Sequence, residues 1–333
     1  MTEKTFDPKE IEAAHRRIAP HVLRTPLVPC YPLSDRTGGE MRLKLELLQP
    51  TGAFKLRGAT NAILSLTDEE RSRGVVTCST GNHGRGVACA AQRVGARAVI
   101  CMSKLVPQTK IDGVKRFGAE VRIIGDSQDE AEVEALRLTR EDGLVYLSPF
   151  DHRDVIAGQG TIGLELLEDW PEVDTVIVPL SGGGLLGGIA AAVKAGKPSV
   201  RLIGVTMDRG PAMVESLAAG GPVEVVEEPT LADSLGGGIG LQNEYTFALI
   251  RDLVDETVLV SEAEIAEAMR YLYREQQIVA EGGASVGVAA LLAGKIDCKG
   301  RKTALIISGR NVDMDVFTRI AAGENVDLKA EKA

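Results

Sequence analysis

The sequence lacks the features that mark several classes of protein. It has no run rich in lysine and arginine, and its net charge is -9, which argues against binding to nucleic acid or to an anionic membrane. The first six residues contain no apolar segment of a secretory signal. The longest apolar run, 176–193, is interrupted by Pro179, Ser181 and five glycines, so it fits a soluble core better than a membrane span. Small molecules are therefore the expected partners.

The cysteines also lack a disulfide pattern. There are five of them, they are scattered, and none forms a C-x-x-C pair. An odd number without such pairs favours a reduced, cytoplasmic protein with free thiols. Hydrophobic residues make up 44% of the 333 residues and charged residues 26%, a globular composition with a well-buried core, long enough for one large domain or two ordinary ones.

From Gly74 onward, short β-branched runs alternate with segments of helical periodicity, a pattern typical of a parallel α/β sheet. We expect residues 71–149 to form a small domain, and residues 1–70 with 150–333 to form a larger one. Strands are expected at 41–47, 75–78, 98–102, 121–124, 144–147, 175–178, 200–205 and 303–307.

Helix starts are predicted from capping residues. Asp7 is the expected N-cap of the first helix, with Glu10 reaching back to complete a capping box, and Ser261 with Glu264 forms a second box. Pro107 and Ser127 are expected to begin two helices of the small domain.

Lys55 lies between Phe54 and Leu56 in a segment bounded by Gly52 and Gly58. A lysine held among apolar side chains loses solvation, which lowers its pKa and leaves a neutral, nucleophilic amine. Schiff-base chemistry requires such an amine. The competing interpretation is a lysine that extends from a helix to water.

Two polar loops each follow a predicted strand and precede a predicted helix. In the first, residues 79–84 read Ser-Thr-Gly-Asn-His-Gly, and the helix start favours an anion such as a carboxylate, although a plain capping turn has the same composition. In the second, residues 181–185 read Ser-Gly-Gly-Gly-Leu and can close around a phosphate. Gly182, Gly184 and Gly187 also satisfy the dinucleotide-binding spacing, with Asp208 as its acid, so a nicotinamide cofactor is the competing interpretation.

These segments resemble the signatures of the fold-type II pyridoxal-phosphate enzymes, in particular the threonine dehydratase and serine racemase branch, and the resemblance covers nearly the whole chain. It implies an α/β fold like that of the tryptophan synthase β subunit, with two open twisted sheets flanked by helices and the cofactor between a large and a small domain. It also implies a homodimer. In this family the lysine of the Ala-Phe-Lys-x-Arg-Gly segment, here Lys55, carries pyridoxal 5'-phosphate as a Schiff base.

The resemblance further assigns site residues. Lys55 and Thr80 are the expected catalytic groups. The cofactor-binding residues it implies are Phe54, Lys55, Asn82, Ser181, Gly182, Gly183, Gly184, Leu185, Glu281 and Ser308. The substrate-binding residues are Ser79, Thr80, Gly81, His83 and Arg310, where the planar fork of Arg310 suits a second anionic group on the substrate but equally suits a surface ion pair.

The reaction expected is elimination of the β-hydroxyl of a 3-hydroxy-2-amino acid, giving a 2-oxo acid and ammonia. Serine racemases place a serine where this chain has Thr80, which is stiffer at χ1, so racemisation on the same scaffold is less favoured. The resemblance also implies that the Ser308 hydroxyl meets the pyridine nitrogen, and a hydroxyl there gives a weaker electron sink than an acid would and disfavours transamination. A nicotinamide-dependent oxidoreductase and a non-catalytic pyridoxal-phosphate protein are two further hypotheses that the sequence leaves open.

Arg85 and Arg310 depart from the residues common in the family, glutamine and glycine. The variant most resembles dehydratases of hydroxyectoine utilisation, an amino-acid catabolic route, so a hydroxyectoine-derived diamino acid joins threonine, serine and hydroxyaspartate as a candidate substrate. Thr206 stands where many members place a glutamate that binds a divalent cation. Hard cations prefer carboxylate ligands, so no metal is expected, unless Asp208 supplies a shifted site.

Overall fold

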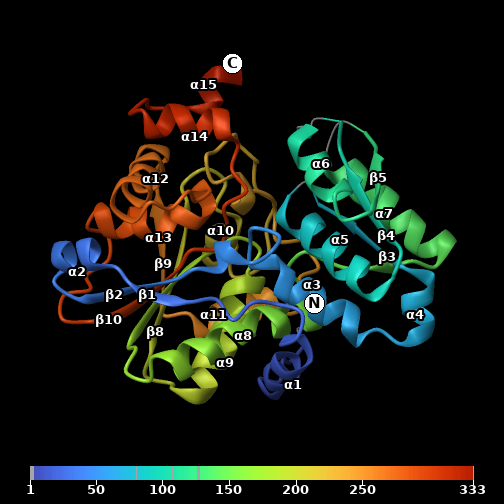
Figure 1. Cartoon of the computed structure of the whole chain (residues 1–333), viewed down its shortest axis with the longest axis horizontal. Coiled ribbons are helices and arrows are strands. Elements are labelled where there is room, and N and C mark those ends of the chain that lie inside the picture. Colours follow the sequence, from blue (N-terminus) through green and yellow to red (C-terminus); the bar gives the residue numbers. More distant parts are fainter. Residues whose placement is uncertain (1–3, 80, 105, 107, 126–127, 333) are drawn as a thin grey trace.

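The computed structural model describes residues 4–79, 81–104, 106, 108–125 and 128–332. Its strands form a six-stranded sheet and a four-stranded sheet. Figure 1 shows the two sheets side by side, with helix α3 (Lys55–Ser65) between the parts of the molecule that contain them. The chain enters the smaller sheet after α3 and returns to the larger one after residue 146.

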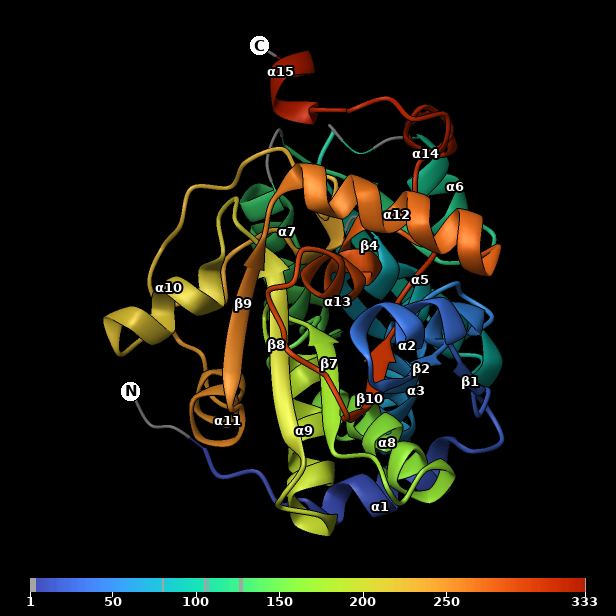
Figure 2. The ribbon, with the colours of Figure 1, turned by 90° about the vertical axis from the view of Figure 1, so that its left-hand side faces the viewer.

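The larger sheet has the strand order β1-β2-β10-β7-β8-β9, and most of this order can be followed across Figure 2. β1 pairs antiparallel with β2, and the other pairings described for this sheet are parallel. Parallel strands direct their carboxyl ends to one edge, which is where open α/β sheets bind ligands. The strands are β1 (Leu27–Pro29), β2 (Glu40–Lys44), β7 (Thr175–Pro179), β8 (Arg201–Met207), β9 (Glu256–Val260) and β10 (Lys302–Ile306).

Helices cover both faces of this sheet because successive strand residues point to opposite sides. Ile177 and Ile203 belong to one core with side chains of α12 and α13, whereas Val176 and Leu202 belong to another with α8 and α9. The covering helices are α8 (Arg153–Asp169), α9 (Gly184–Gly196), α10 (Ala212–Ala219), α11 (Thr246–Leu253), α12 (Glu262–Gln276), α13 (Gly282–Leu292) and α14 (Met314–Ala321).

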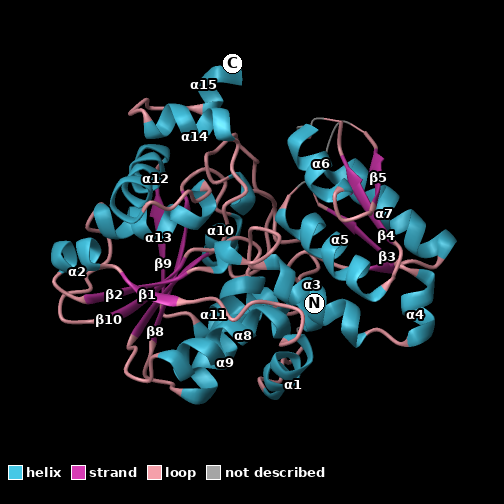
Figure 3. Ribbon diagram, viewed as in Figure 1, coloured by secondary structure: helices cyan, strands magenta, loops and turns pink. Residues whose placement is uncertain are grey.

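The smaller sheet is parallel, with the order β5-β4-β3-β6. Ile100 packs with α3 and α5 on one face, and Val99 packs with α7 on the other. The elements here are α4 (Asp68–Arg73), β3 (Val75–Cys78), α5 (Asn82–Val94), β4 (Ala98–Met102), α6 (Gln108–Lys115), β5 (Glu120–Ile123), α7 (Gln128–Asp142) and β6 (Val145–Tyr146). Figure 3 shows these strands framed by helices, as in the larger sheet.

The first helix corrects two expectations. The N-cap of α1 (Lys9–Ile18) is Pro8 rather than Asp7, although the Asp7 carboxylate still accepts a hydrogen bond from the Lys9 N–H at 3.0 Å. The capping box expected of Glu10 is wrong, because Glu10 pairs with Arg153 of α8 instead. The second box, at Ser261 and Glu264 of α12, is confirmed. The predicted helix starts at Pro107 and Ser127 lie outside the described residues. The remaining short elements are α2 (Tyr31–Thr37), η1 (Glu46–Leu48), η2 (Asp233–Leu235) and α15 (Leu328–Lys332).

A buried cluster of charges fixes the start of α3. Arg57 is fully buried, and its guanidinium lies 2.8 Å from Glu46 and 2.6 Å from Glu165. Lys44 is also fully buried, with its Nζ 2.6 Å from the second oxygen of Glu165. Two cations therefore face two carboxylates. Glu46 reaches this cluster from η1, which explains why the strand expected at 41–47 ends at Lys44.

Among the described residues, no helix is both long and apolar enough to cross a membrane. The five cysteines are buried, and no disulfide links these described residues.

Candidate active site

A cavity of about 590 Å³ lies where the carboxyl ends of β3, β7 and β10 meet. Residues from both halves of the chain line it. They include Phe54, Lys55, Ser79, Gly81, Asn82, His83, the turn 181–185, Glu281 and Ser308. The structure therefore brings together most of the residues that the sequence proposes for one site. Thr80 lies outside the described residues.

Lys55 is the first residue of α3. The preceding backbone is tied to the end of β10, since the Phe54 N–H donates to the Ser308 carbonyl at 3.0 Å. The Lys55 ammonium donates to the Pro149 carbonyl at 2.6 Å, which is a neutral partner. Burial lowers the pKa of Lys55 to about 8, partly opposed by the negative charge of Glu281. About one tenth of the Lys55 amine is therefore neutral at pH 7, far more than for an ordinary lysine.

The glycine turn, residues 181–185, also lines the cavity and opens α9. Gly183 is the N-cap, with a φ of 89° that favours glycine. Gly182 has no room for a side chain, because an added Cβ would lie 2.4 Å from Cγ of Phe150. The dipeptide Pro149–Phe150 therefore touches the Lys55 amine through its first residue and the glycine turn through its second. The amides at the start of α9 form an anion site of the kind that holds phosphate.

The loop before α5 forms a second helix start on the cavity. The Ser79 hydroxyl accepts hydrogen bonds from the N–H groups of Gly81 and Gly84, at 3.3 and 3.1 Å. Gly86 packs on the start of α3, because an added Cβ would lie 3.2 Å from the carbonyl carbon of Lys55. The starts of α3 and α5 are therefore adjacent, and the first residues of α5 line the cavity together with Lys55.

His83 is buried, and its Nε2 lies 3.2 Å from the Leu147 carbonyl oxygen. Burial, reinforced by nearby Lys55, lowers the pKa of the imidazole to about 3, so the ring is neutral. The carbonyl can only accept, so we place the proton on Nε2. The buried Nδ1 is then an acceptor without a hydrogen-bond partner among the described residues. An acceptor cannot donate to a carboxylate, so the substrate contact expected of His83 is confined to its backbone N–H.

Glu281 is 4% exposed at the N-cap of α13 and accepts hydrogen bonds from neighbouring amides. Asn82 Nδ2 donates to it at 2.8 Å, and the Asn311 backbone N–H at 3.0 Å. Burial raises the pKa of the Glu281 carboxyl, and Asp233 raises it further. Gly309 leaves the space for this carboxylate, because an added Cβ would lie 2.6 Å from Oε1.

Asn311 and Arg85 extend this network, and the sequence assigned a site role to neither. The Asn311 side chain donates to the Asn82 side-chain oxygen at 2.6 Å, and Arg85 donates to the Asn311 side-chain oxygen at the same distance. Both residues line the cavity. The sequence offered two signals for them. Arg85 stands where the family commonly has glutamine, and Asn311 comes just after the Ser308 turn.

Arg310 corrects the expectation of a second anion contact. Its side chain is exposed and, among the described residues, it is not one that lines the cavity. Its backbone N–H donates to the Gly52 carbonyl at 2.9 Å, so the backbone of Arg310 is held against the segment before Lys55 while its guanidinium stays exposed.

The structure also places the residues named for a metal or a dinucleotide. The described residues contain no group of three or more His, Cys, Asp or Glu that could hold a metal ion. Asp208 is exposed beyond β8 and, within the described part of the chain, does not line the cavity that the glycine turn lines. The buried Thr206 hydroxyl lies 3.3 Å from the sulfur of Met207.

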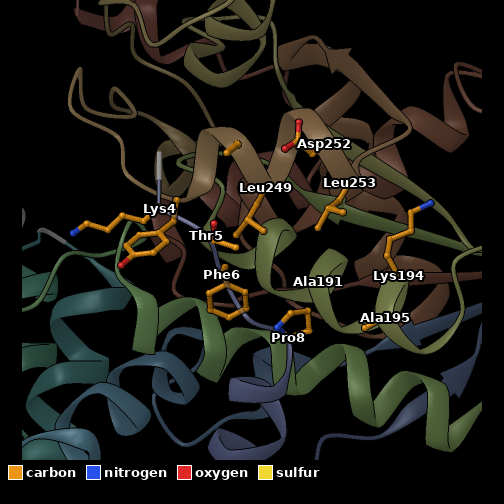
Figure 4. Close-up of a pocket in the computed structure, with 12 residues that line it drawn as sticks. Lys4, Thr5, Phe6, Pro8, Ala191, Lys194, Ala195, Leu249, Asp252 and Leu253 are labelled. Atoms are coloured by element: carbon orange, nitrogen blue, oxygen red, sulfur yellow. The ribbon is translucent and has the colours of Figure 1, made fainter. Parts of the chain in front are cut away.

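A second cavity, of about 490 Å³, lies between the N-terminal segment and helices α9 and α11 (Figure 4). Its walls are largely apolar, with Phe6, Leu249 and Leu253 among them. The two lysines at its rim already pair with carboxylates, Lys4 with Glu244 and Lys194 with Asp255. This hollow therefore offers no nucleophile comparable to Lys55 among the residues described.

Comparisons with known proteins agree with this geometry. The family described as "Pyridoxal-phosphate dependent enzyme" matches residues 18–309. The chain is 46% identical over 312 residues to the L-threonine ammonia-lyase of Thermotoga maritima, covering 94% of this chain and 77% of that protein. It is 40% identical over 313 residues to the catabolic L-threonine dehydratase of Escherichia coli K12, covering 93% and 94%. The structure of maize serine racemase superposes with a TM-score of 0.90 at 37% identity, covering 95% of this chain and 97% of that one.

Proposed function

This chain belongs to the family of pyridoxal-phosphate dependent enzymes, and we propose that it eliminates the β-hydroxyl of a 3-hydroxy-2-amino acid to give a 2-oxo acid and ammonia. The fold class expected from the sequence, that of the fold-type II enzymes, is confirmed. The chain is accordingly a pyridoxal-phosphate-dependent lyase of the ammonia-lyase type. The single observation that carries the proposal is the cavity shared by Lys55 and the glycine turn.

The described residues fit the cofactor. Lys55 supplies an amine with a lowered pKa, and the turn 181–185 at the start of α9 supplies backbone donors for a phosphate. Ser308 is 3% exposed and places a hydroxyl, rather than an acid, on the same cavity. When bound, pyridoxal phosphate supplies an electron sink next to the α-carbon of the substrate.

Lys55 is the proposed base that removes the proton from the α-carbon. A base works best when its pKa lies near the working pH, and burial brings the pKa of Lys55 to about 8. The Pro149 carbonyl, 2.6 Å from Nζ, holds the amine in place without adding a countercharge that would keep it protonated.

The start of α5 is the proposed site for the substrate carboxylate. Ser79, whose hydroxyl accepts from the N–H groups of Gly81 and Gly84, orders the turn, and the backbone amides of Asn82 and His83 provide donors at a helix N-terminus. The Asn82 side chain is held by Glu281 and Asn311, so its orientation is fixed before substrate binds.

Racemisation is the second candidate, favoured by the similarity to maize serine racemase. The neutral Ser308 hydroxyl gives a weaker electron sink than an acid would, which favours elimination over transamination but does not by itself separate elimination from racemisation. The proposal keeps elimination first because of Thr80, a β-branched residue whose rotamers are restricted.

The substrate panel contains L-threonine, L-serine, 3-hydroxyaspartate and a hydroxyectoine-derived diamino acid. Each is incubated with the holoenzyme, and ammonia, 2-oxo acid and the configuration of the remaining amino acid are measured. Equal yields of ammonia and 2-oxo acid support the dehydratase. Inversion without ammonia supports the racemase, and neither product from any substrate contradicts both. Sedimentation velocity on the same sample tests the homodimer proposed from the family resemblance.

A further inference from the structure

We propose that Arg85 selects hydroxyamino acids that carry a second anionic group, such as 3-hydroxyaspartate, over those with a neutral side chain, such as threonine. This inference rests on the proposed dehydratase function, because it names the substrate class of the same site. A chain that discriminates in this way needs a cation on the cavity wall, close to the substrate and held in a fixed orientation.

Arg85 has the required position. It lies in the first turn of α5, three residues after Asn82, so the two side chains are neighbours on one helix face. Both line the cavity with Lys55. Asn311 links the two side chains, because it accepts a hydrogen bond from Arg85 and donates one to Asn82, so Arg85 belongs to the same hydrogen-bonded wall of the cavity as Asn82.

The guanidinium is also held in place. One of its N–H groups donates to the Asn311 side-chain oxygen at 2.6 Å. On the other side Gly113 of α6 makes room for it, because an added Cβ there would lie 2.4 Å from Arg85 Nε. A fork fixed in this way loses little conformational entropy when it binds a carboxylate with two parallel hydrogen bonds.

Arg85 is a partly buried cation on the cavity wall. Burial lowers the pKa of its guanidinium, the negative charge of Glu281 opposes this, and the positive charge of Arg116 adds a smaller lowering. An arginine stays charged under these conditions, so the group can attract an anionic part of a substrate.

The competing interpretation is that Arg85 only orients Asn82 through Asn311. A neutral donor such as glutamine could do the same. The two interpretations differ in what the charge does: a positioning role affects all substrates alike, whereas a selective role affects dianionic substrates most.

The first experiment compares kcat/KM for L-threo-3-hydroxyaspartate and L-threonine in the holoenzyme, in Arg85→Gln and in Arg85→Lys. We expect the wild type to prefer hydroxyaspartate, Arg85→Gln to lower the ratio by about 100-fold, and Arg85→Lys to fall between, because lysine keeps the charge but loses the fork. The matched control is Arg116→Gln, an exposed arginine of the same neighbourhood, which should change the ratio by less than about threefold.

The second experiment measures binding without turnover, by calorimetry on the holoenzyme. Malate and 3-hydroxybutyrate correspond to hydroxyaspartate and threonine without the amine, so neither can react. Arg85→Gln should weaken the binding of malate by about 30-fold or more, and the binding of 3-hydroxybutyrate by less than about threefold. Equal losses for both ligands, or no loss for either, would overturn the inference.

The two proposals fail in different ways. If threonine and hydroxyaspartate both release ammonia but the Arg85 variants leave their ratio unchanged, the dehydratase stands and the selectivity does not. If malate binding depends on Arg85 while no hydroxyamino acid releases ammonia, the dianion site stands and the dehydratase does not.

Discussion

Lys44 and Lys55 are close in sequence and both lie in the interior, yet they contact opposite kinds of partner. Lys44, at the end of β2, is fully buried with its Nζ 2.6 Å from the Glu165 carboxylate and 2.7 Å from the Thr25 carbonyl. Lys55, at the start of α3, donates to the neutral Pro149 carbonyl, and its pKa is lowered to about 8. One lysine has a countercharge within contact distance, and the other has none among its described contacts.

The comparison shows that partner charge, rather than burial, decides the chemistry of a buried amine. A carboxylate in contact compensates the desolvation of an ammonium, so Lys44 serves as a structural charge. A carbonyl compensates it only in part, so Lys55 is ready to lose its proton. The same helix start holds both arrangements, because Arg57, two residues after Lys55, belongs to the ionic cluster of Lys44.

The largest effect is expected from Lys55→Met. Loss of the amine should lower turnover by at least about 10⁴-fold, because the proposed base and cofactor attachment are lost together. The measurement is ammonia release at saturating substrate, together with the visible absorbance of the bound cofactor. Lys44→Met is the matched variant and should retain that absorbance once folded. Turnover above one part in about a hundred in Lys55→Met would refute the assignment.

Lys44→Met should have the second largest effect, on stability instead of turnover. Without Lys44, the buried Glu165 carboxylate keeps Arg57 as a partner but loses one of its two cations. Removing one partner of a buried ion pair typically costs about 3–5 kcal/mol of unfolding free energy. Urea denaturation of the apoprotein at pH 7 measures it. Lys9→Met, an exposed lysine of α1, is the control and should change the free energy by less than about 0.5 kcal/mol. If Lys44→Met and Lys9→Met lower the unfolding free energy by similar amounts, the ion pair of Lys44 does not stabilise the fold as proposed.

The pH dependence of stability should separate the two lysines further. Because the pKa of Lys55 is about 8 in the folded protein and 10.5 as its ordinary value, the unfolded chain binds more protons between these values. Stability from this group therefore rises as pH increases from 8 toward 10.5. We expect a gain of roughly 1–2 kcal/mol, discounted for the water that the cavity admits. The unfolding free energy of the wild-type apoprotein minus that of Lys55→Met, followed from pH 7 to 10, isolates this contribution from the tyrosines and cysteines. A flat difference would mean that Lys55 is not desolvated.

The smallest effect is expected from Thr25→Val. The Thr25 hydroxyl donates to Glu46 inside the ionic cluster, and a net hydrogen bond of this kind contributes about 1–2 kcal/mol. The change should lower the unfolding free energy by that amount and leave turnover within about twofold, since Thr25 lines no part of the described cavity. A loss of turnover larger than the loss of stability would show that the two regions are coupled.

Much of the fold could be predicted because local patterns and the family signatures agreed. The strands expected at 75–78 and 98–102 are found with those bounds, since both are short β-branched runs ended by turn residues. The half-buried edge strand β9 was missed, because its Glu256–Val260 segment lies directly before a strong helix start at Ser261. Antiparallel β1 was missed because three residues carry no periodicity.

The ionic cluster and the roles of the two arginines could not be predicted from local sequence. An alternating strand places Lys44 on the polar face, where it would meet water if Glu165 did not arrive from α8. Arg85 and Arg310 each follow a glycine in a loop or helix start, and nothing in those neighbours decides which guanidinium faces the cavity. That choice depends on α6, where Gly113 leaves space for Arg85, and on the Ser308 turn, which leaves Arg310 exposed.

The dipeptide Pro149–Phe150 joins the smaller sheet to α8 and contacts the amine and the glycine turn with successive residues. The Pro149 carbonyl contacts the Lys55 amine, and the Phe150 ring packs against Gly182, so one dipeptide contacts both parts of the proposed cofactor site. Any rotation of the smaller sheet about this connection would shift both contacts at once, in the same direction. A substitution at either position of the dipeptide would therefore affect the amine and the glycine turn through one short connection.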